Sequence, residues 1–139
     1  MNTDIKEHLI LHGIKPSPQR MAVMEYILSH HTHPTVEEVF AALHPNIPTL
    51  SKTTVYNTLK LLSDKGAVTA VTIDDRNIRY DGEAAFHAHF RCKNCGAIHD
   101  IRVKELSIHL HQESKSHKLT DVQIYYHGYC QDCKKKIKI

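Results

Sequence analysis

Apolar residues in positions 1–66 recur every three or four residues, which is the period of helices that bury one face. In residues 34–43, for example, Val36, Val39 and Leu43 fall on the same side of a helix. Residues that start and stop helices divide the region into short segments. The helices predicted in this way cover residues 4–13, 17–31, 34–43 and 51–65.

The helix boundaries are marked by particular side chains. Ser17 is a suitable N-cap, and Pro18 occupies the first helical position, where its missing N–H costs nothing. Thr35 and Glu38 have the spacing of a capping box, and Gly66 follows the last helix, where a glycine commonly ends one. We therefore expect three closely spaced helices followed by a fourth.

The pattern then changes to strands. Residues 67–73 and 78–81, separated by the turn-forming sequence DDRN, predict a β-hairpin. Short helices followed by a two-stranded wing predict a winged helix-turn-helix. This arrangement gives an N-terminal DNA-binding domain over residues 1–82.

The remaining residues, 83–139, predict a smaller α/β domain. Strands are expected at 87–91, 97–101 and 122–129, with a helix at 103–114. The predicted fold class is therefore α+β: an N-terminal winged helix-turn-helix domain and a small C-terminal α/β dimerisation domain.

The fourth predicted helix has a polar face suited to the major groove of DNA, where Thr, Asn and Lys reach base edges and phosphates and Tyr packs on a thymine methyl. The candidate DNA-binding residues on this face are Lys52, Thr53, Thr54, Tyr56, Asn57 and Lys60. An ordinary core helix with a polar outer face has the same pattern. Residues 1–82 also hold eight Lys and Arg against nine Asp and Glu, which is not the basic footprint of most nucleic-acid-binding domains.

Composition sets a few limits. The 139-residue chain has a net charge of +3. It has no apolar run long enough to span a membrane, and its N-terminus lacks a signal-peptide pattern. We therefore expect a soluble, cytoplasmic protein with no membrane partner. The sequence KKKIK near the C-terminus is either a solvated end or a nucleic-acid patch. A domain as small as residues 83–139 usually needs a metal or another cross-link to remain folded.

The four cysteines form two CxxC pairs, Cys92 with Cys95 and Cys130 with Cys133. In a reducing compartment this pattern favours a metal site over disulfides. Four thiolates predict a closed tetrahedral zinc site with a structural role. A redox switch made of the paired thiols is the alternative.

Strand parity separates a second group of ligands from the cysteines. His87 and His89 lie two residues apart and share a face of a strand, whereas Cys92 has the opposite parity. A hairpin centred between Cys92 and Cys95 would place Asp100 opposite His87. The alternative is that these are packed or surface histidines beside a zinc turn.

Three ligands are too few to hold an ion tightly, and Asp81 and His33 are candidates for the missing ones. Three nitrogens and two carboxylates would favour iron(II) or manganese(II). Of the possible ligands, the spacing supports only His87, His89 and Asp100.

Five motifs together resemble the ferric uptake regulator (Fur) family of metal-dependent repressors, and the resemblance runs from about residue 10 to Cys133. The motifs are KPSPQR at 15–20, HPTVEEVF at 33–40, TTVYNTLKLL at 53–62, RYD at 79–81 and HAHFRCKNCG at 87–96.

The resemblance implies a homodimer that binds a palindromic operator when a regulatory ion is loaded. It implies that the helix from Ser51 to Lys65 is the recognition helix, and it adds Arg20 to the candidate DNA contacts. It also implies two sets of metal ligands. The structural zinc would be held by Cys92, Cys95, Cys130 and Cys133, and the regulatory iron or manganese by His33, Asp81, His87, His89 and Asp100.

Within the family, the chain is most similar to the peroxide-sensing PerR branch, because Asp100 stands where iron sensors commonly carry glutamate. The resemblance then implies that iron(II) and hydrogen peroxide oxidise His33 or His87 and so release DNA. The alternative within the family is a metal-responsive repressor of metal uptake. Outside it, a zinc-stapled RNA-binding module and a metallohydrolase are alternatives, although the sequence shows no general base and we expect no enzymatic activity.

Overall fold

The computed structural model describes residues 2–74, 76–83, 87–102, 116–118 and 122–137. The chain divides into two compact units, Met1–Ala84 and Ala85–Ile139, which are described separately below. The helix predicted over residues 103–114 lies outside the described residues. Helices with two small sheets confirm the predicted α+β class.

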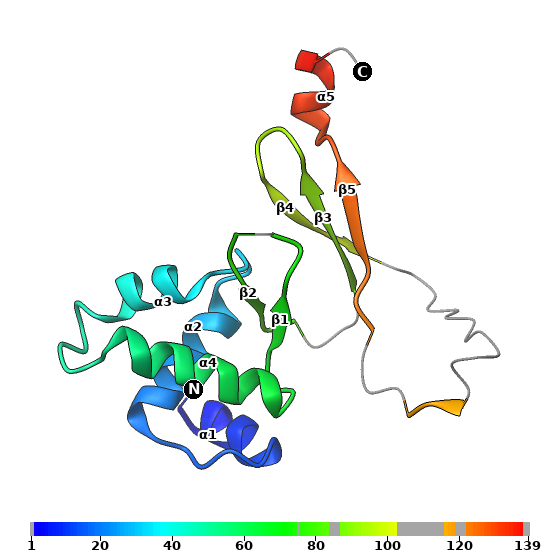
Figure 1. The fold of residues 1–139 in the computed structure, drawn as a ribbon. Coiled ribbons are helices and arrows are strands. Elements are labelled where there is room, and N and C mark those ends of the chain that lie inside the picture. The colour runs from blue at the N-terminus through cyan, green and yellow to red at the C-terminus, as the bar shows by residue number, and fades with distance from the viewer. Residues whose placement is uncertain (1, 75, 84–86, 103–115, 119–121, 138–139) are drawn as a thin grey trace. The chain divides into compact units, whose positions relative to one another are not determined.

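The first unit contains four helices and a hairpin (Figure 1). Its elements are α1 (Asn2–Leu11), α2 (Pro18–Ser29), α3 (Val36–Leu43), α4 (Lys52–Asp64), β1 (Thr69–Val71) and β2 (Arg79–Asp81). The two strands pair antiparallel, with Ala70 opposite Tyr80, and they form the wing. The predicted winged helix-turn-helix is thus confirmed.

The expected capping interactions hold these helices. The hydroxyl of Ser17 accepts a hydrogen bond from the backbone N–H of Arg20 at 3.2 Å, and Pro18 occupies the first turn of α2. Thr35 and Glu38 form a complete capping box, with bonds of 3.2 and 3.1 Å. Each bond satisfies a backbone donor that a helix start leaves without an intrahelical partner.

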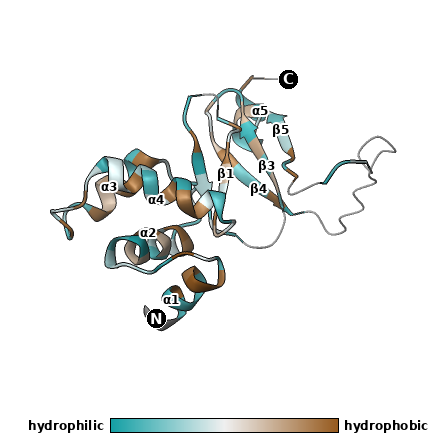
Figure 2. Ribbon diagram, turned by 60° about the horizontal axis from the view of Figure 1, so that its bottom comes forward, coloured by the Kyte–Doolittle hydropathy of each residue, from teal (hydrophilic) through white to brown (hydrophobic). Residues whose placement is uncertain are grey.

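A single apolar cluster holds the first unit together, with side chains from all four helices and the wing. Figure 2 shows that these helices carry both hydrophobic and hydrophilic positions, as the period of the sequence predicts. The most deeply buried members of this cluster are Leu9, Ile14, Val23, Met24, Ile27, Val39, Leu50, Val55, Leu59, Leu62 and Tyr80.

The second unit is a three-stranded sheet followed by a short helix. Its elements are β3 (His87–Cys92), β4 (Ile98–Arg102), β5 (Tyr125–Gly128) and α5 (Gln131–Ile137). The strand order is β4-β3-β5, with β4 antiparallel and β5 parallel to the central strand β3. The helix α5 was not predicted. Lys134, Lys135 and Lys136 lie in its last turn and Asp132 in its first, as the helix dipole favours.

The register of β3 with β4 differs from the predicted one. Asp100 lies opposite His89, not His87, and His87 pairs with Arg102. The predicted turn was too short, because Cys92 N–H bonds Ala97 C=O at 2.9 Å and closes a turn of four residues. The difference of two residues preserves side-chain parity, so Asp100 still lies on the same face as the two histidines.

No helix within the described part of the chain is long and apolar enough to cross a membrane.

Helix α1 offers a matched test of the core. Leu9 is fully buried, whereas Leu11 is 83% exposed. Replacing Leu9 by alanine should lower the free energy of unfolding by about 2–5 kcal/mol, because it removes buried methyl groups and leaves a cavity. Leu11→Ala should change it by less than about 0.5 kcal/mol. Urea denaturation of both variants measures the difference, and equal effects would contradict the packing of α1 described above.

Candidate metal centres

The four cysteines converge at one end of the second unit. Cys92 ends β3, Cys95 lies in the following turn, Cys130 follows β5, and Cys133 lies on α5. Their sulfur atoms all lie within 4.8 Å of one another, and Cys95 Sγ is 3.8 Å from Cys130 Sγ. Four sulfurs arranged tetrahedrally around zinc at its usual bond length are about 3.8 Å apart. None of the cysteines forms a disulfide, and the geometry suits a closed zinc site.

Two backbone features bring the distant CxxC pairs together. Gly96 adopts a positive φ of 76°, which lets the chain turn back after Cys95. Strand β5 pairs parallel with β3 and places Gly128 beside Cys92, and Lys93 N–H bonds Gly128 C=O at 2.7 Å. Cys130 follows two residues later and so arrives next to Cys92.

Hydrogen bonds to sulfur favour thiolates in this cluster. The N–H groups of Cys130 and Cys95 lie 3.4 and 3.5 Å from Cys92 Sγ. Burial opposes ionisation of Cys92, but these N–H groups and that of Asn94 lower its pKa from 9.0 to about 6. The hydrogen bonds therefore favour the thiolate form of Cys92, which is the form that binds metals.

The side chain of Asn94 was not among the predicted site residues. Its amide donates to Cys133 Sγ at 3.3 Å and lowers the pKa of Cys133, but the neighbouring Cys130 and burial outweigh it and raise that pKa to about 11. Several thiols share one small volume and cannot all ionise without a cation. The opposite pKa shifts of Cys92 and Cys133 thus agree with a site built to hold a metal ion.

A second group of ligands lies on the β3–β4 hairpin of the same unit. The Nε2 atoms of His87 and His89 are 3.2 Å apart. Asp100 Oδ1 lies 3.3 Å from His87 Nε2 and 3.6 Å from His89 Nε2. The two imidazole side chains are only 9% and 3% exposed. Two ring nitrogens and a carboxylate oxygen therefore point to a common position, as expected for metal ligands.

The first unit contains the other predicted pair. His33 precedes α3 and Asp81 ends β2, and His33 Nε2 lies 3.5 Å from Asp81 Oδ2. Both residues are buried. Gly82 follows Asp81, and a side chain at this position would come within 3.0 Å of Ile27 on α2, so glycine lets β2 end close to that helix.

The candidate DNA contacts lie on the predicted face of α4. Tyr56 is 48% exposed, while Val55 and Leu59 on the other face are fully buried. Lys52 pairs with Glu37 of α3 at 2.8 Å, and Lys60 with Asp64 at 3.3 Å. Both pairs are exposed, and exposed ion pairs of this kind contribute little stability, so the lysines can exchange them for phosphates.

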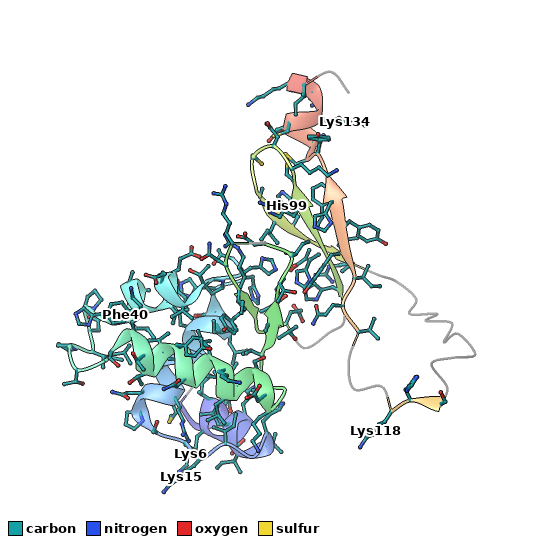
Figure 3. All side chains as sticks on the ribbon, in the orientation of Figure 1. Lys6, Lys15, Phe40, His99, Lys118 and Lys134 are labelled. Carbon is teal, nitrogen blue, oxygen red and sulfur yellow. The ribbon has the colours of Figure 1, made fainter. Side chains whose placement is uncertain are left out.

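Arg20 has a role that the sequence did not indicate. Its guanidinium donates to the backbone carbonyl of Lys15 at 2.8 Å and holds the loop before α2. This loop, the start of α2 and α4 line an open hollow of about 450 Å³. Lys15, which extends away from the ribbon in Figure 3, is exposed at its edge. The hollow is lined by the predicted candidates Thr54 and Asn57 and also by Lys15, Ser17 and Gln19. These last three residues belong to the KPSPQR motif but were not predicted as DNA contacts.

A winged helix-turn-helix unit followed by a small unit with clustered thiols, two imidazoles and a carboxylate is typical of the class of two-domain, metal-binding regulators. Within that class, the model of the ferric uptake regulator family matches residues 11–129. The chain belongs to this family.

Individual relatives support the same family assignment. The peroxide-responsive repressor PerR of Staphylococcus aureus strain Mu50 is 36% identical over 129 aligned positions, and the match covers 89% of this chain and 85% of the relative. A solved structure of PerR from Streptococcus pyogenes is 32% identical, with a TM-score of 0.53, and covers 95% of this chain and 92% of its own. The Helicobacter pylori ferric uptake regulator Fur shares the fold, with a TM-score of 0.75 and 22% sequence identity. This match covers 96% of this chain and 94% of the Helicobacter pylori chain.

The cysteine cluster predicts retention of one zinc ion per chain. Cys92→Ser should abolish this retention after dialysis and lower stability sharply, because such an ion contributes about 10–16 kcal/mol of apparent binding free energy. Elemental analysis of the dialysed protein measures the zinc. His99→Ala, which changes an exposed residue of β4, is the matched control and should keep the ion. A Cys92→Ser protein with full zinc content would contradict the assignment.

Proposed function

We propose that this protein is a metal-dependent, DNA-binding transcriptional repressor that senses hydrogen peroxide. The observation that carries the proposal is the convergence of His87, His89 and Asp100 on one position, in a family member whose curated relatives are named peroxide-responsive repressors. Residues 1–82 form its DNA-binding domain, and residues 83–139 form its dimerisation and metal-binding domain.

The four-cysteine site holds zinc and has a structural role. Its four sulfurs leave no open coordination position for a substrate. The small second unit gains its stability from this ion, which joins the turn after β3 to α5. The zinc also keeps the thiolates out of the sensing chemistry.

A second ion, iron(II) or manganese(II), binds His33, Asp81, His87, His89 and Asp100. Three imidazoles and two carboxylates are harder donors than the thiolates and suit these ions, and the two carboxylates balance a divalent charge. The donor geometry within each unit supports this fit: His33 meets Asp81 in the first, and His87 and His89 meet Asp100 in the second. Each group alone supplies too few ligands.

Metal binding controls DNA binding because the ligands come from both domains. An ion shared by them selects one arrangement of the recognition helix relative to the dimerisation domain. In a homodimer on a palindromic operator, both copies of α4 then reach successive major grooves, about 34–36 Å apart. The exposed residues of α4 contact the bases, and Lys15 and Arg20 lie beside the same surface.

Sensing follows from oxidation of a ligand. Iron(II) bound by these residues would activate hydrogen peroxide. In the net reaction, one peroxide oxygen would be inserted into a ring C–H bond of the His33 or His87 imidazole and the other would leave as water, so that the oxidised ring could no longer act as a ligand. The remaining ligands would hold the ion less tightly, and the repressor would leave its operator.

Metal-dependent DNA binding is the first test. The duplex is first selected from random sequence by the manganese-loaded protein. At limiting manganese, His89→Ala should weaken binding to this duplex by about a hundredfold or more, because loss of a ligand should exceed the ten- to hundredfold loss typical when a group that orients a ligand is removed. The zinc content should not change. His99→Ala, on the same hairpin, should bind like the unmodified protein in gel-shift titrations. Duplex binding that does not depend on manganese would favour a zinc-stapled nucleic-acid-binding module instead.

Peroxide sensing is tested by mass spectrometry. Hydrogen peroxide added to the iron-loaded protein should add one oxygen to a peptide containing His33 or His87 and release the duplex, whereas the manganese-loaded protein should stay unmodified. Oxidation confined to cysteines, with release of DNA, would reverse the assignment of the two sites. Reversible release on iron removal without any oxidation would identify a metal-responsive repressor of metal uptake.

A further inference from the structure

His33 has an unusual backbone conformation. Its φ is +55°, in the left-handed region, and it is the one residue other than glycine with a positive φ among the described residues. A side chain with a Cβ atom adopts this region at a conformational cost, so the surrounding structure must hold it there. The next residue, Pro34, has no N–H with which to secure the turn.

Three consecutive residues of β2 supply that support. Arg79 Nη1 donates to the backbone carbonyl of His33 at 3.2 Å, Tyr80 N–H donates to the carbonyl of Pro34 at 3.0 Å, and Asp81 meets the His33 imidazole at 3.5 Å. The Tyr80 ring is buried in the core of the first unit, which fixes the strand. The wing strand therefore holds both the backbone and the side chain of His33.

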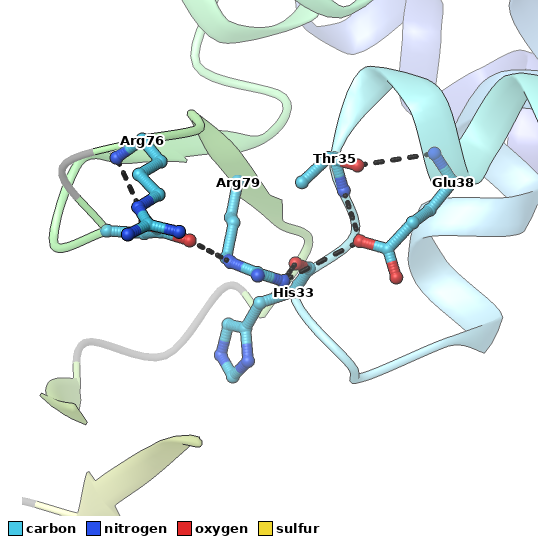
Figure 4. A network of polar contacts seen from close by, with 6 residues as sticks. His33, Thr35, Glu38, Arg76 and Arg79 are labelled. Carbon is cyan, nitrogen blue, oxygen red and sulfur yellow. Dashed lines mark hydrogen bonds and ion pairs between the residues drawn. The ribbon is translucent and has the colours of Figure 1, made fainter. Parts of the chain in front are cut away.

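Arg79 is itself fixed by two carboxylates (Figure 4). Its Nε donates to Asp74 Oδ2 at 3.2 Å, and its Nη1 lies 3.6 Å from Glu38 Oε1. Asp74 is only 10% exposed, and Glu38 is the capping-box residue whose carboxylate also accepts from Thr35 N–H. The planar guanidinium thus joins the wing turn, the start of α3 and the carbonyl of His33.

We propose that Arg79 is a positioning residue for the regulatory metal: by holding the carbonyl of His33, it keeps the strained turn in place and the imidazole directed toward Asp81. The inference rests on the proposed function, because it takes His33 as a metal ligand. Arginine suits the task better than lysine, since its rigid fork reaches several acceptors in one plane.

The test is manganese affinity. Arg79→Gln should weaken manganese binding by about ten- to a hundredfold, the loss typical when a group that orients a metal ligand is removed. Arg79→Lys, which keeps the charge, should recover part of the loss. Electron paramagnetic resonance of free manganese measures the affinity, and zinc content and thermal unfolding show whether each variant is folded.

Arg76→Gln is the matched control. Arg76 lies in the same hairpin, is exposed, and bonds Asp74 through its backbone N–H at 3.0 Å, which the substitution keeps. It should bind manganese like the unmodified protein. If Arg76→Gln and Arg79→Gln weaken binding equally, the effect is one of wing charge and the proposal fails.

A double substitution separates positioning from general destabilisation. If Arg79 acts through His33, then Arg79→Gln should cause little further loss of manganese affinity in a His33→Ala background. Losses that multiply would show that Arg79 acts independently of His33 and would overturn the inference. If His33→Ala leaves the manganese affinity unchanged, the assignment of His33 as a ligand in the proposed function is wrong. If His33→Ala lowers the affinity but Arg79→Gln does not, the positioning role of Arg79 is wrong and the proposed function stands.

Discussion

The alternation of side chains along β3 is the constraint on which both candidate metal centres depend. His87 and His89 share one face of this strand, and Cys92 at its end has the opposite parity. One short strand therefore serves two sites without mixing their ligands. The antiparallel partner β4 adds Asp100 to the histidines, and the parallel partner β5 delivers Cys130 and Cys133 to the thiol cluster. Soft and hard donors are kept apart, so each site can select a different ion.

The sequence predicted this separation because it depends on parity alone. The exact pairing of Asp100 was wrong by two residues, since the closure of the turn at Ala97 is set by backbone hydrogen bonds that spacing does not specify. A slip of one residue would have moved Asp100 to the other face, but a slip of two did not. In the first unit, the N-caps Ser17 and Thr35 were predictable, because each is a local interaction within four residues.

Long-range contacts of single side chains were not predictable. The bond from Asn94 to Cys133 spans 39 positions, and that from Arg79 to the His33 carbonyl spans 46. Neither leaves a periodic signal in the sequence. Arg20 stays a candidate DNA contact, but the sequence did not indicate that its guanidinium holds the Lys15 carbonyl and so shapes the surface beside α4. The helix α5 was missed because its sequence is too short to show a repeated apolar period of helical spacing, and Cys133 is its buried residue.

The central claim of the account is that one regulatory ion takes ligands from both domains. X-ray absorption spectroscopy of the manganese-loaded protein tests it directly, because imidazole ligands give a recognisable scattering pattern that can be counted. The account predicts three imidazoles in the unmodified protein, two in His33→Ala and two in His87→Ala. An unchanged spectrum in His33→Ala, combined with loss of an imidazole in His87→Ala, would show that the ion binds to the second domain alone and would contradict the account.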